Sequence, residues 1–382
     1  MDAHPALLRH PPRRPRRLSG RDTRPGDAPR RPGCWPEDEE GHMSVADATT
    51  RALRRLYRTT MRSDRLRRKL YEIYSAEGYA DLWQHEHMLA DRVRVDAYAA
   101  AIERGIGPDD VVLDVGTGSG ILSLLAARQA RKVYAIDHGD FIAVARRMAA
   151  LHGVGNVEFL QVNSREFEPP EPISVVLHEQ MGDELINEDM VANLLDLRRV
   201  LRDGGRFLPA RFELFVEPVE LHPEARVPLL WELDLHGISY AALEHDPVIS
   251  PFVGERHQHH HLAPGQVAQL LTDPQPLLTL DLDDPGIPDE VPARLSAQRT
   301  VTAPGHLDGC AVWFRAIFDE ATVLSTSPLE PPTHWANRLL RTPQRTVQPG
   351  DRVEYRLDLP DVLRPGTWRL ALDHVPATAA AS

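Results

Sequence analysis

The sequence predicts an α/β protein in which a doubly wound parallel sheet is followed by an antiparallel β-barrel. Two observations lead to this fold class. Between residues 92 and 200, stretches with helical periodicity alternate with short apolar runs that are typical of buried parallel strands. After Gly205 the helical pattern stops, and runs punctuated by Pro and Gly indicate antiparallel barrel or sandwich strands. We place the boundary near Pro209.

The predicted elements follow one another in a regular order. Helices are expected at 92–104, 120–129, 140–152 and 188–200. Strands of the parallel sheet are expected in VVLDV (111–115), KVYAID (132–137), VEFLQV (157–162) and ISVVL (173–177). Barrel strands are expected within 211–221, 276–282, 310–318, 352–359 and 367–372.

The composition indicates a soluble protein with more than one domain. The chain has 382 residues, 42% of them hydrophobic, which is ample for a packed core. No run approaches the roughly 20 apolar residues of a membrane span, and no secretory signal is present, so we expect no membrane partner. Two distant cysteines, Cys34 and Cys310, favour a cytoplasmic location. The formal charge of -12 makes a nucleic-acid partner unlikely and leaves room for a cationic substrate.

The N-terminal segment is rich in Arg and Pro and differs from the rest of the chain. Residues 1–44, which include PPRRPRR at 11–17, cannot bury enough apolar surface to fold alone, so we expect a disordered tail. It is either a regulatory or nucleic-acid-binding tail, or the product of an upstream start codon with Met43 as the true beginning. Two helices are expected between residues 45 and 83.

A glycine-rich turn follows the first predicted strand. In VVLDVGTGSGIL (111–122), Gly116 and Gly118 allow a tight turn and a close approach to a ligand at a helix N-terminus. Asp114 precedes the glycines, and Asp137 closes the next strand, where a carboxylate can bind ribose hydroxyls. Ser164, after the third strand, completes the predicted cofactor contacts. The pattern resembles that of class I S-adenosylmethionine methyltransferases.

Two glutamates lie nine residues apart after the apolar strand ISVVL. Glu179 is expected at the carboxyl end of a central strand, where open α/β sheets bind their ligands, and Glu188 opens the next helix. A loop of this length can bring both carboxylates to one rim of a pocket. A guanidinium would relieve their repulsion because its planar fork can bond a carboxylate on each side.

Four ordered motifs resemble those of the protein arginine N-methyltransferases, and the chain is identified as a bacterial member of that family. HEQMGDELINE (178–188) is similar to the family's double-glutamate loop, and HEHMLADRVR (85–94) to its motif H-E-x-M-L-x-D-x-V-R. STSPLEPPTHW (325–335) resembles its Thr-His-Trp loop. A segment at about 226–246 resembles the helical arm through which members form dimers. The similarity covers about 75–382.

The resemblance implies a role for each matching residue. Glu179 and Glu188 would orient the acceptor guanidinium, with Asp91 and His334 assisting them. S-adenosyl-L-methionine would be the cofactor, with Arg94 on its carboxylate. The remaining implied contacts are Met88 and Met190 beside the methyl group and Trp335 on the substrate. Asp183 departs from the family pattern, and its extra carboxylate is a candidate to bind the α-amino group of a substrate.

The resemblance also implies a domain organisation. Residues 45–209 would hold the N-terminal helices and a Rossmann-like cofactor domain. Residues 210–382 would form a barrel that binds substrate and makes a homodimer.

No metal site is predicted, and the histidines of ERHQHHHL (255–262) are expected in a solvated loop.

Several positions depart from the family pattern and leave the acceptor open. SAEGY (75–79) retains only Tyr79 of an aromatic lid, and Gln180, Asp183 and Asn187 replace frequent aromatic residues. The acceptor is therefore either arginine in a protein or peptide, or free arginine or another small guanidino or amine metabolite. A non-catalytic dimeric module is a third alternative. The two methionines are either methyl-site residues or core filler, and the number of methyl groups transferred is not predicted.

Overall fold

The computed structural model describes residues 81–254 and 257–377. The predicted tail, the lid stretch 75–79 and nearly all of the predicted N-terminal helices lie outside these residues. Within the described ranges, none of the helices has the length and apolar character needed to cross a membrane.

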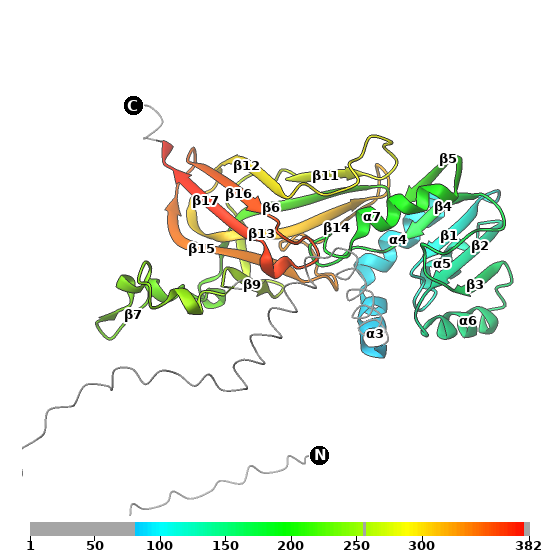
Figure 1. Cartoon of the computed structure of the whole chain (residues 1–382), viewed down its shortest axis with the longest axis horizontal. Helices are drawn as coiled ribbons and strands as arrows, with labels where there is room; N and C mark the ends of the chain where they lie inside the picture. The colour runs from blue at the N-terminus through cyan, green and yellow to red at the C-terminus, as the bar shows by residue number, and fades with distance from the viewer. Residues whose placement is uncertain (1–80, 255–256, 378–382) are drawn as a thin grey trace, which may run out of the picture. The chain divides into compact units, whose positions relative to one another are not determined.

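The first half is built on a five-stranded parallel sheet with the order β3-β2-β1-β4-β5 (Figure 1). The strands are β1 (Val111–Val115), β2 (Lys132–Asp137), β3 (Val157–Gln161), β4 (Ile173–His178) and β5 (Leu201–Leu208). All residues of β1 and β4 are buried, as expected for central parallel strands. The fold prediction is thus confirmed for this half. Strand β5 was missed because its Gly204 and Gly205 read as a turn.

The four helices predicted in this half lie close to their expected positions, and a further helix over residues 82–90 was not predicted. The helices are α3 (Leu82–Ala90), α4 (Arg92–Gly105), α5 (Ile121–Ala126), α6 (Ile142–Leu151), α7 (Met190–Asp196) and the 3-10 helix η1 (Leu197–Val200). Helix α4 begins where it does because the Asp91 Oδ1 accepts a hydrogen bond from the Arg94 N–H at 2.9 Å, which satisfies one free donor of the first turn. Helix α7 begins at Met190, two residues later than predicted.

The second half is antiparallel. Its larger sheet has the order β10-β6-β13-β15-β9, with β11 on β6 and β14 on β13. These strands are β6 (Arg211–Leu221), β9 (His259–Leu262), β10 (Val267–Leu270), β11 (Leu278–Asp281), β13 (Gly305–Ile317), β14 (Val323–Ser325) and β15 (Asn337–Val347). A smaller sheet joins β12 (Arg294–Thr300), β16 (Arg352–Asp358) and β17 (Arg369–Val375). The 3-10 helix η2 (Pro223–Ala225) follows β6 of the larger sheet, and η6 (Pro365–Thr367) lies between β16 and β17 of the smaller one.

The predicted arm is less regular than expected. Its secondary structure consists of a hairpin of β7 (Asp234–Leu235) and β8 (Ile238–Ser239) and the short 3-10 helices η3 (Leu230–Glu232) and η4 (Ala241–Leu243), followed by η5 (Ser250–Phe252). Gly237, with a φ of 81°, makes the hairpin turn. Over the described arm, single 3-10 turns therefore replace the predicted α-helix.

The histidine-rich stretch is also more ordered than expected. His259, His260 and His261 belong to β9, which pairs with β15, and the His259 Nε2 lies 3.0 Å from the Trp368 carbonyl. The expectation of a loop is wrong for residues 259–262, because they pair with β15 as a strand whose histidines are only partly exposed or, at His261, exposed.

The two halves share one hydrophobic core. Its buried members include Val112 and Leu177 from the parallel sheet and Phe212 and Phe314 from the barrel. The Tyr98 hydroxyl of α4 donates to the His178 carbonyl at 2.8 Å, and α4 also contacts β14. A cavity at this junction can therefore be lined by both halves.

Candidate active site

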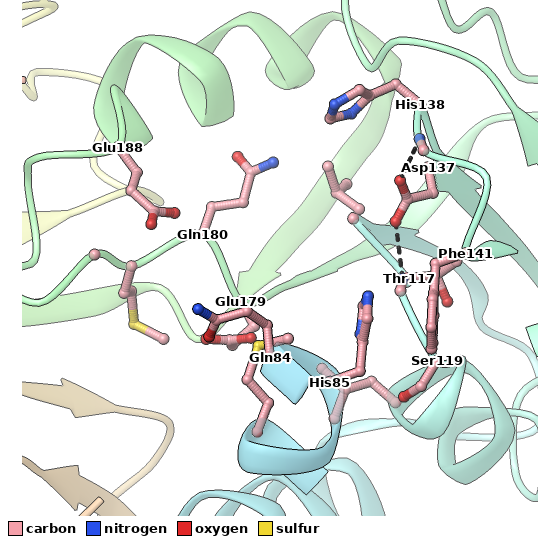
Figure 2. Close-up of a pocket in the computed structure, with 18 of the residues that line it drawn as sticks. Gln84, His85, Thr117, Ser119, Asp137, His138, Phe141, Glu179, Gln180 and Glu188 are labelled. Atoms are coloured by element: carbon pink, nitrogen blue, oxygen red, sulfur yellow. Dashed lines mark hydrogen bonds between the residues drawn. The ribbon is translucent and has the colours of Figure 1, made fainter. Parts of the chain in front are cut away.

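A cavity of about 850 Å³ opens at the carboxyl ends of β1, β2 and β4. The loop that follows β4, helix α3 and residues 334–336 of the barrel complete its lining. Figure 2 shows Glu179, Gln180 and Glu188 in the same space as Asp137 and Phe141. Both glutamates and Gly116 thus line one cavity, as the guanidinium hypothesis requires.

Most predicted site residues lie on this cavity, and three do not. The predicted residues that line it are Met88, Arg94, Gly116, Gly118, Asp137, Ser164, Glu179, Asp183, Glu188, His334 and Trp335. Asp91, Asp114 and Met190 lie behind this lining.

The glycine turn leaves open space for a ligand. Gly116 has a φ of 72°, and an added Cβ there would meet no atom of the described residues within 4 Å. Gly120 has a φ of 83°, and a Cβ there would lie 2.7 Å from the Ala145 Cβ, so α5 packs tightly on α6. Only the first of these glycines faces the cavity.

Asp114 shapes the turn from behind and does not line the cavity, so its direct contact with the cofactor stays a prediction. It is 1% exposed, and its Oδ2 accepts hydrogen bonds from the hydroxyls of Thr117 and Ser123. Burial raises the pKa of Asp114 to about 6, although the two hydroxyl hydrogen bonds oppose the shift. The sequence pattern located the acid correctly but could not tell which way it faces.

Asp137 closes the other side of the turn. Its Oδ2 accepts from the Gly118 N–H at 2.9 Å and its Oδ1 from the Gly139 N–H at 2.7 Å (Figure 2). Each carboxylate oxygen has further lone pairs, so hydroxyl donors can still bind there. Beside it, the ring of His85 stacks on Phe141 with centroids 3.5 Å apart.

Arg94 joins the cofactor side of the cavity to the glutamates. It is 4% exposed; its Nη1 donates to the Glu179 Oε2 at 2.9 Å and its Nη2 to the Met88 carbonyl at 2.8 Å. Its Nε is buried and has no hydrogen-bond partner within the structure. A buried guanidinium with a donor to spare suits an anionic group such as a carboxylate.

The acceptor side combines two glutamates with a histidine from the barrel. Glu179 follows β4 and Glu188 precedes α7, and both side chains reach the cavity (Figure 2). The His334 Nε2 lies 3.9 Å from the Glu179 Oε1. Since Arg94 bonds the other oxygen of Glu179, Oε1 faces the cavity and His334.

His334 is held by Asp91. The Asp91 Oδ2 is 2.9 Å from the His334 Nδ1 and accepts the His334 backbone N–H at 2.8 Å. Burial acts to raise the pKa of Asp91, but the hydrogen bonds from His334 and from the Arg94 backbone together hold that pKa below its ordinary value. Asp91 therefore remains a charged acceptor that caps α4 and orients His334.

The two residues predicted to bind substrate also tie the glutamate loop to the barrel. The Trp335 Nε1 donates to the Met181 carbonyl at 2.7 Å, and the Ala336 N–H donates to the Asp183 Oδ1 at 2.9 Å. Trp335 is only 6% exposed and packs edge-on against Phe314. The Trp335 Nε1–H and the Asp183 Oδ1 thus already have hydrogen-bond partners within the protein.

Met190 lies in the core, as the core-filler alternative for the two methionines expects, and its place beside the methyl group stays a prediction. It is fully buried within the shared core, whereas Met88 lines the cavity. The direction in which a residue at the start of a helix points depends on how that helix docks, and the sequence did not reveal it.

Sequence reasoning missed two kinds of residue at this site. His85 and Phe141 stack beside the glycine turn, and Glu184 forms a buried ion pair with Arg338. His85 begins the motif HEHMLADRVR (85–94), so the sequence did contain a signal for this residue. Glu184 and Arg338 are 154 residues apart, and nothing in one sequence links them.

The chain matches models of two known domain families in succession. Residues 112–205 match a methyltransferase domain, and residues 214–363 match the arginine methyltransferase oligomerization subdomain. Protein arginine N-methyltransferase 6 of Xenopus tropicalis is 30% identical over 273 residues, which cover 69% of this chain and 78% of that protein.

The chain belongs to the protein arginine N-methyltransferase family. It is also 28% identical over 277 residues to protein arginine N-methyltransferase 6 of Danio rerio, which covers 69% of this chain and 77% of that protein. The family resemblance and the cofactor predicted from it are thereby confirmed.

Solved structures of the family share the fold. Protein arginine methyltransferase 10 of Arabidopsis thaliana superposes with a TM-score of 0.63 at 24% identity, covering 79% of this chain and 95% of that one. The Trypanosoma brucei PRMT1 enzyme-prozyme complex with AdoHcy gives a TM-score of 0.60 at 24% identity, covering 73% and 88%.

Proposed function

We propose that this protein transfers a methyl group from S-adenosylmethionine to a guanidino nitrogen of arginine in a protein or peptide. The observation that carries the proposal is the placement of Glu179 and Glu188 on one cavity with the glycine turn and the His334–Asp91 pair. Membership of the arginine methyltransferase family supports the same chemistry.

The cofactor side fits the proposed methyl donor. Arg94, whose buried Nε has no hydrogen-bond partner among the described residues, would hold the amino-acid carboxylate. Asp137 would accept the ribose hydroxyls, and the space before Gly116 admits close backbone contact. When bound there, S-adenosylmethionine supplies an electrophilic methyl group, and the residues around it hold the reactants in line.

The glutamates would orient the acceptor. An arginine guanidinium keeps its proton in water, so its nitrogen is a poor nucleophile. Glu179, through its Oε1, and Glu188 would bond the nitrogens that do not react and draw positive charge towards them. Arg94 anchors the other oxygen of Glu179 at 2.9 Å and so fixes the direction of Oε1.

The His334–Asp91 pair would receive the proton that the attacked nitrogen loses. With its Nδ1–H donated to Asp91, His334 presents a basic Nε2 beside the Glu179 Oε1, 3.9 Å away. Asp91 stabilises the imidazolium that forms, because its own charge is retained.

The proposal is tested with purified protein, labelled S-adenosylmethionine and a panel of acceptors: an arginine-glycine peptide, free arginine and a lysine peptide. We expect label in the arginine peptide alone and a loss of about 100-fold or more in Glu179→Gln, as for other electrostatic contacts to a reacting group. Label in the lysine peptide, or undiminished turnover by the variant, would contradict the proposal.

A small guanidino metabolite is a second candidate acceptor. The Oε1 of Gln180 is buried and has no hydrogen-bond partner within the structure, and this residue lines the cavity. It is suited to accept a hydrogen bond from the ammonium group of a free amino acid. Preferential labelling of free arginine in the same panel would favour this candidate.

Homodimer formation through the arm remains a proposal. Leu235 and Ile238 of the arm are 50% and 65% exposed, which supports an apolar contact with a second copy. A variant lacking residues 228–245 should sediment as a monomer, and a dimeric deletion variant would exclude the arm. The cytoplasmic location likewise remains a prediction from cysteine usage.

A further inference from the structure

The loop between the two glutamates carries a third acid, Glu184, at its midpoint. Glu184 is 1% exposed, and its Oε1 accepts a hydrogen bond from the Nε of Arg338 on β15. The Arg338 side chain is itself 12% exposed. A carboxylate and a guanidinium removed this far from water require each other, because neither has enough solvent to stabilise its charge.

This ion pair is the last of three links between the loop and one barrel segment. Met181, Asp183 and Glu184 bond in turn to Trp335, Ala336 and Arg338. The first two links each use a backbone group on one side. The third joins two charged side chains, and so it depends on both residue types.

The loop needs such an anchor because its backbone is left-handed on both sides of Glu188. Leu185, next to Glu184, has a φ of 66°, and Asp189, next to Glu188, has a φ of 55°. Apart from Gly, and to a lesser degree Asn and Asp, residues rarely adopt this left-handed conformation, and at a bulky residue such as Leu185 it persists only where surrounding contacts enforce it. Leu185 is fully buried directly after the ion pair.

We propose that Glu184 and Arg338 are a positioning pair that holds the loop in the shape in which Glu179 and Glu188 face the same guanidinium. This inference rests on the proposed function for its effect on catalysis. The pair itself touches neither reactant. It links the barrel to the acceptor site, so that both acids are presented only when the barrel segment 335–338 is docked.

The electrostatics support this dependence. Burial raises the pKa of Glu184 to about 7, Arg338 opposes the shift and Asp183 adds to it. Without Arg338 the charged form of Glu184 would lose its only strong stabilising partner among the described residues. The carboxyl group would then become neutral or move towards water, and the loop would move with it.

The test compares Arg338→Gln and Glu184→Gln with the wild-type protein. We expect kcat/KM for the arginine peptide to fall by about 10- to 100-fold, as a displacement of about 1 Å does for reacting groups. The Kd of S-adenosylhomocysteine should stay within about twofold, because the pair lies outside the cofactor side. Hydrogen exchange of residues 180–187 should accelerate, while residues 112–120 stay protected.

Arg104→Gln is the matched control. Arg104 of α4 bonds Asp319 of the barrel at 3.0 Å and so also joins the two halves, but neither residue lines the cavity. This control should leave both kcat/KM and loop exchange unchanged. The conservative Arg338→Lys and the exchanged pair E184R/R338E should each recover part of the lost activity.

Two results would overturn the inference. One is wild-type transfer and wild-type loop exchange in Arg338→Gln. The other is an equal loss in Arg104→Gln, which would mean that any contact between the halves has the same effect. If the wild-type protein methylates no acceptor, the proposed function fails, and the exchange measurements alone then decide whether the pair positions the loop.

Discussion

The two sides of the cavity are built in different ways. On the cofactor side, Asp114 bonds Thr117 and Ser123, three and nine residues away, and Asp137 bonds Gly118, 19 residues away. On the acceptor side, His334 bonds Asp91 across 243 residues. Apart from Arg94 and the residues of α3, the first side lies within one strand-turn-helix-strand unit, whereas the second forms only when the barrel has docked.

The difference has a functional consequence. A local site pays little chain entropy for its assembly and can stay ordered by itself. The acceptor site depends on distant contacts, such as that from Trp335 to the Met181 carbonyl, and can be disturbed without damage to the cofactor site. Changes on the two sides should therefore separate transfer from cofactor binding.

The largest effect is expected on the acceptor side. Glu188→Gln should lower kcat/KM by about 100- to 1,000-fold, the cost of removing one charge-stabilising contact, with cofactor binding within a factor of about three. Glu188 is the cleaner choice because Glu179 also holds Arg94. Steady-state kinetics and calorimetry measure the two effects.

The control for this prediction is Glu166→Gln, an exposed acid just beyond Ser164 that does not line the cavity. It should behave as the wild type. A loss of cofactor affinity in Glu188→Gln as large as the loss of turnover would break the separation between the two sides.

The next effect is expected on the cofactor side. Gly120→Ala places a Cβ 2.7 Å from the Ala145 Cβ at a φ of 83°. Overpacking and left-handed strain together should lower the free energy of unfolding by about 2–4 kcal/mol. The midpoint of urea unfolding, with and without S-adenosylhomocysteine, measures this loss.

Gly153→Ala is the matched control. Gly153 has a φ of 66°, but an added Cβ would meet no atom within 4 Å in the described part of the chain. Only the strain of about 1–2 kcal/mol should remain. Equal losses in the two variants would show that the packing of α5 on α6 contributes nothing to the turn.

The smallest effect concerns the pH dependence of Asp114. Burial raises its pKa to about 6, so the folded state prefers the protonated acid. Its favourable contribution is fully present below the ordinary pKa and is lost as the pH rises through about 6. At about 1.4 kcal/mol per pKa unit, the free energy of unfolding should fall by about 2–3 kcal/mol as the pH rises through this range.

Comparison with Asp114→Asn isolates this contribution, because all other titrating groups are shared. The difference in unfolding free energy between the two proteins, measured by urea titration from pH 4 to 8, should shift in favour of the variant as the pH rises. Parallel curves would mean that Asp114 titrates normally and that the turn is more open to water.

The order of the two folds and the positions of the main site motifs could be predicted from the sequence alone. The alternation of helical and strand periodicity predicted the parallel sheet and then the barrel, because both patterns arise from neighbouring residues. The positions of the glycine turn, Glu179, Glu188 and His334 could be predicted for the same reason, since each lies in a short contiguous motif.

Tertiary structure decided which way the side chains face and which distant residues meet. It turned Asp114 behind the glycine turn and placed Met190 in the core. It also brought Arg338 of β15 to Glu184 in the loop after β4. These outcomes depend on how helices and sheets pack against one another, and no local pattern in the chain records that packing.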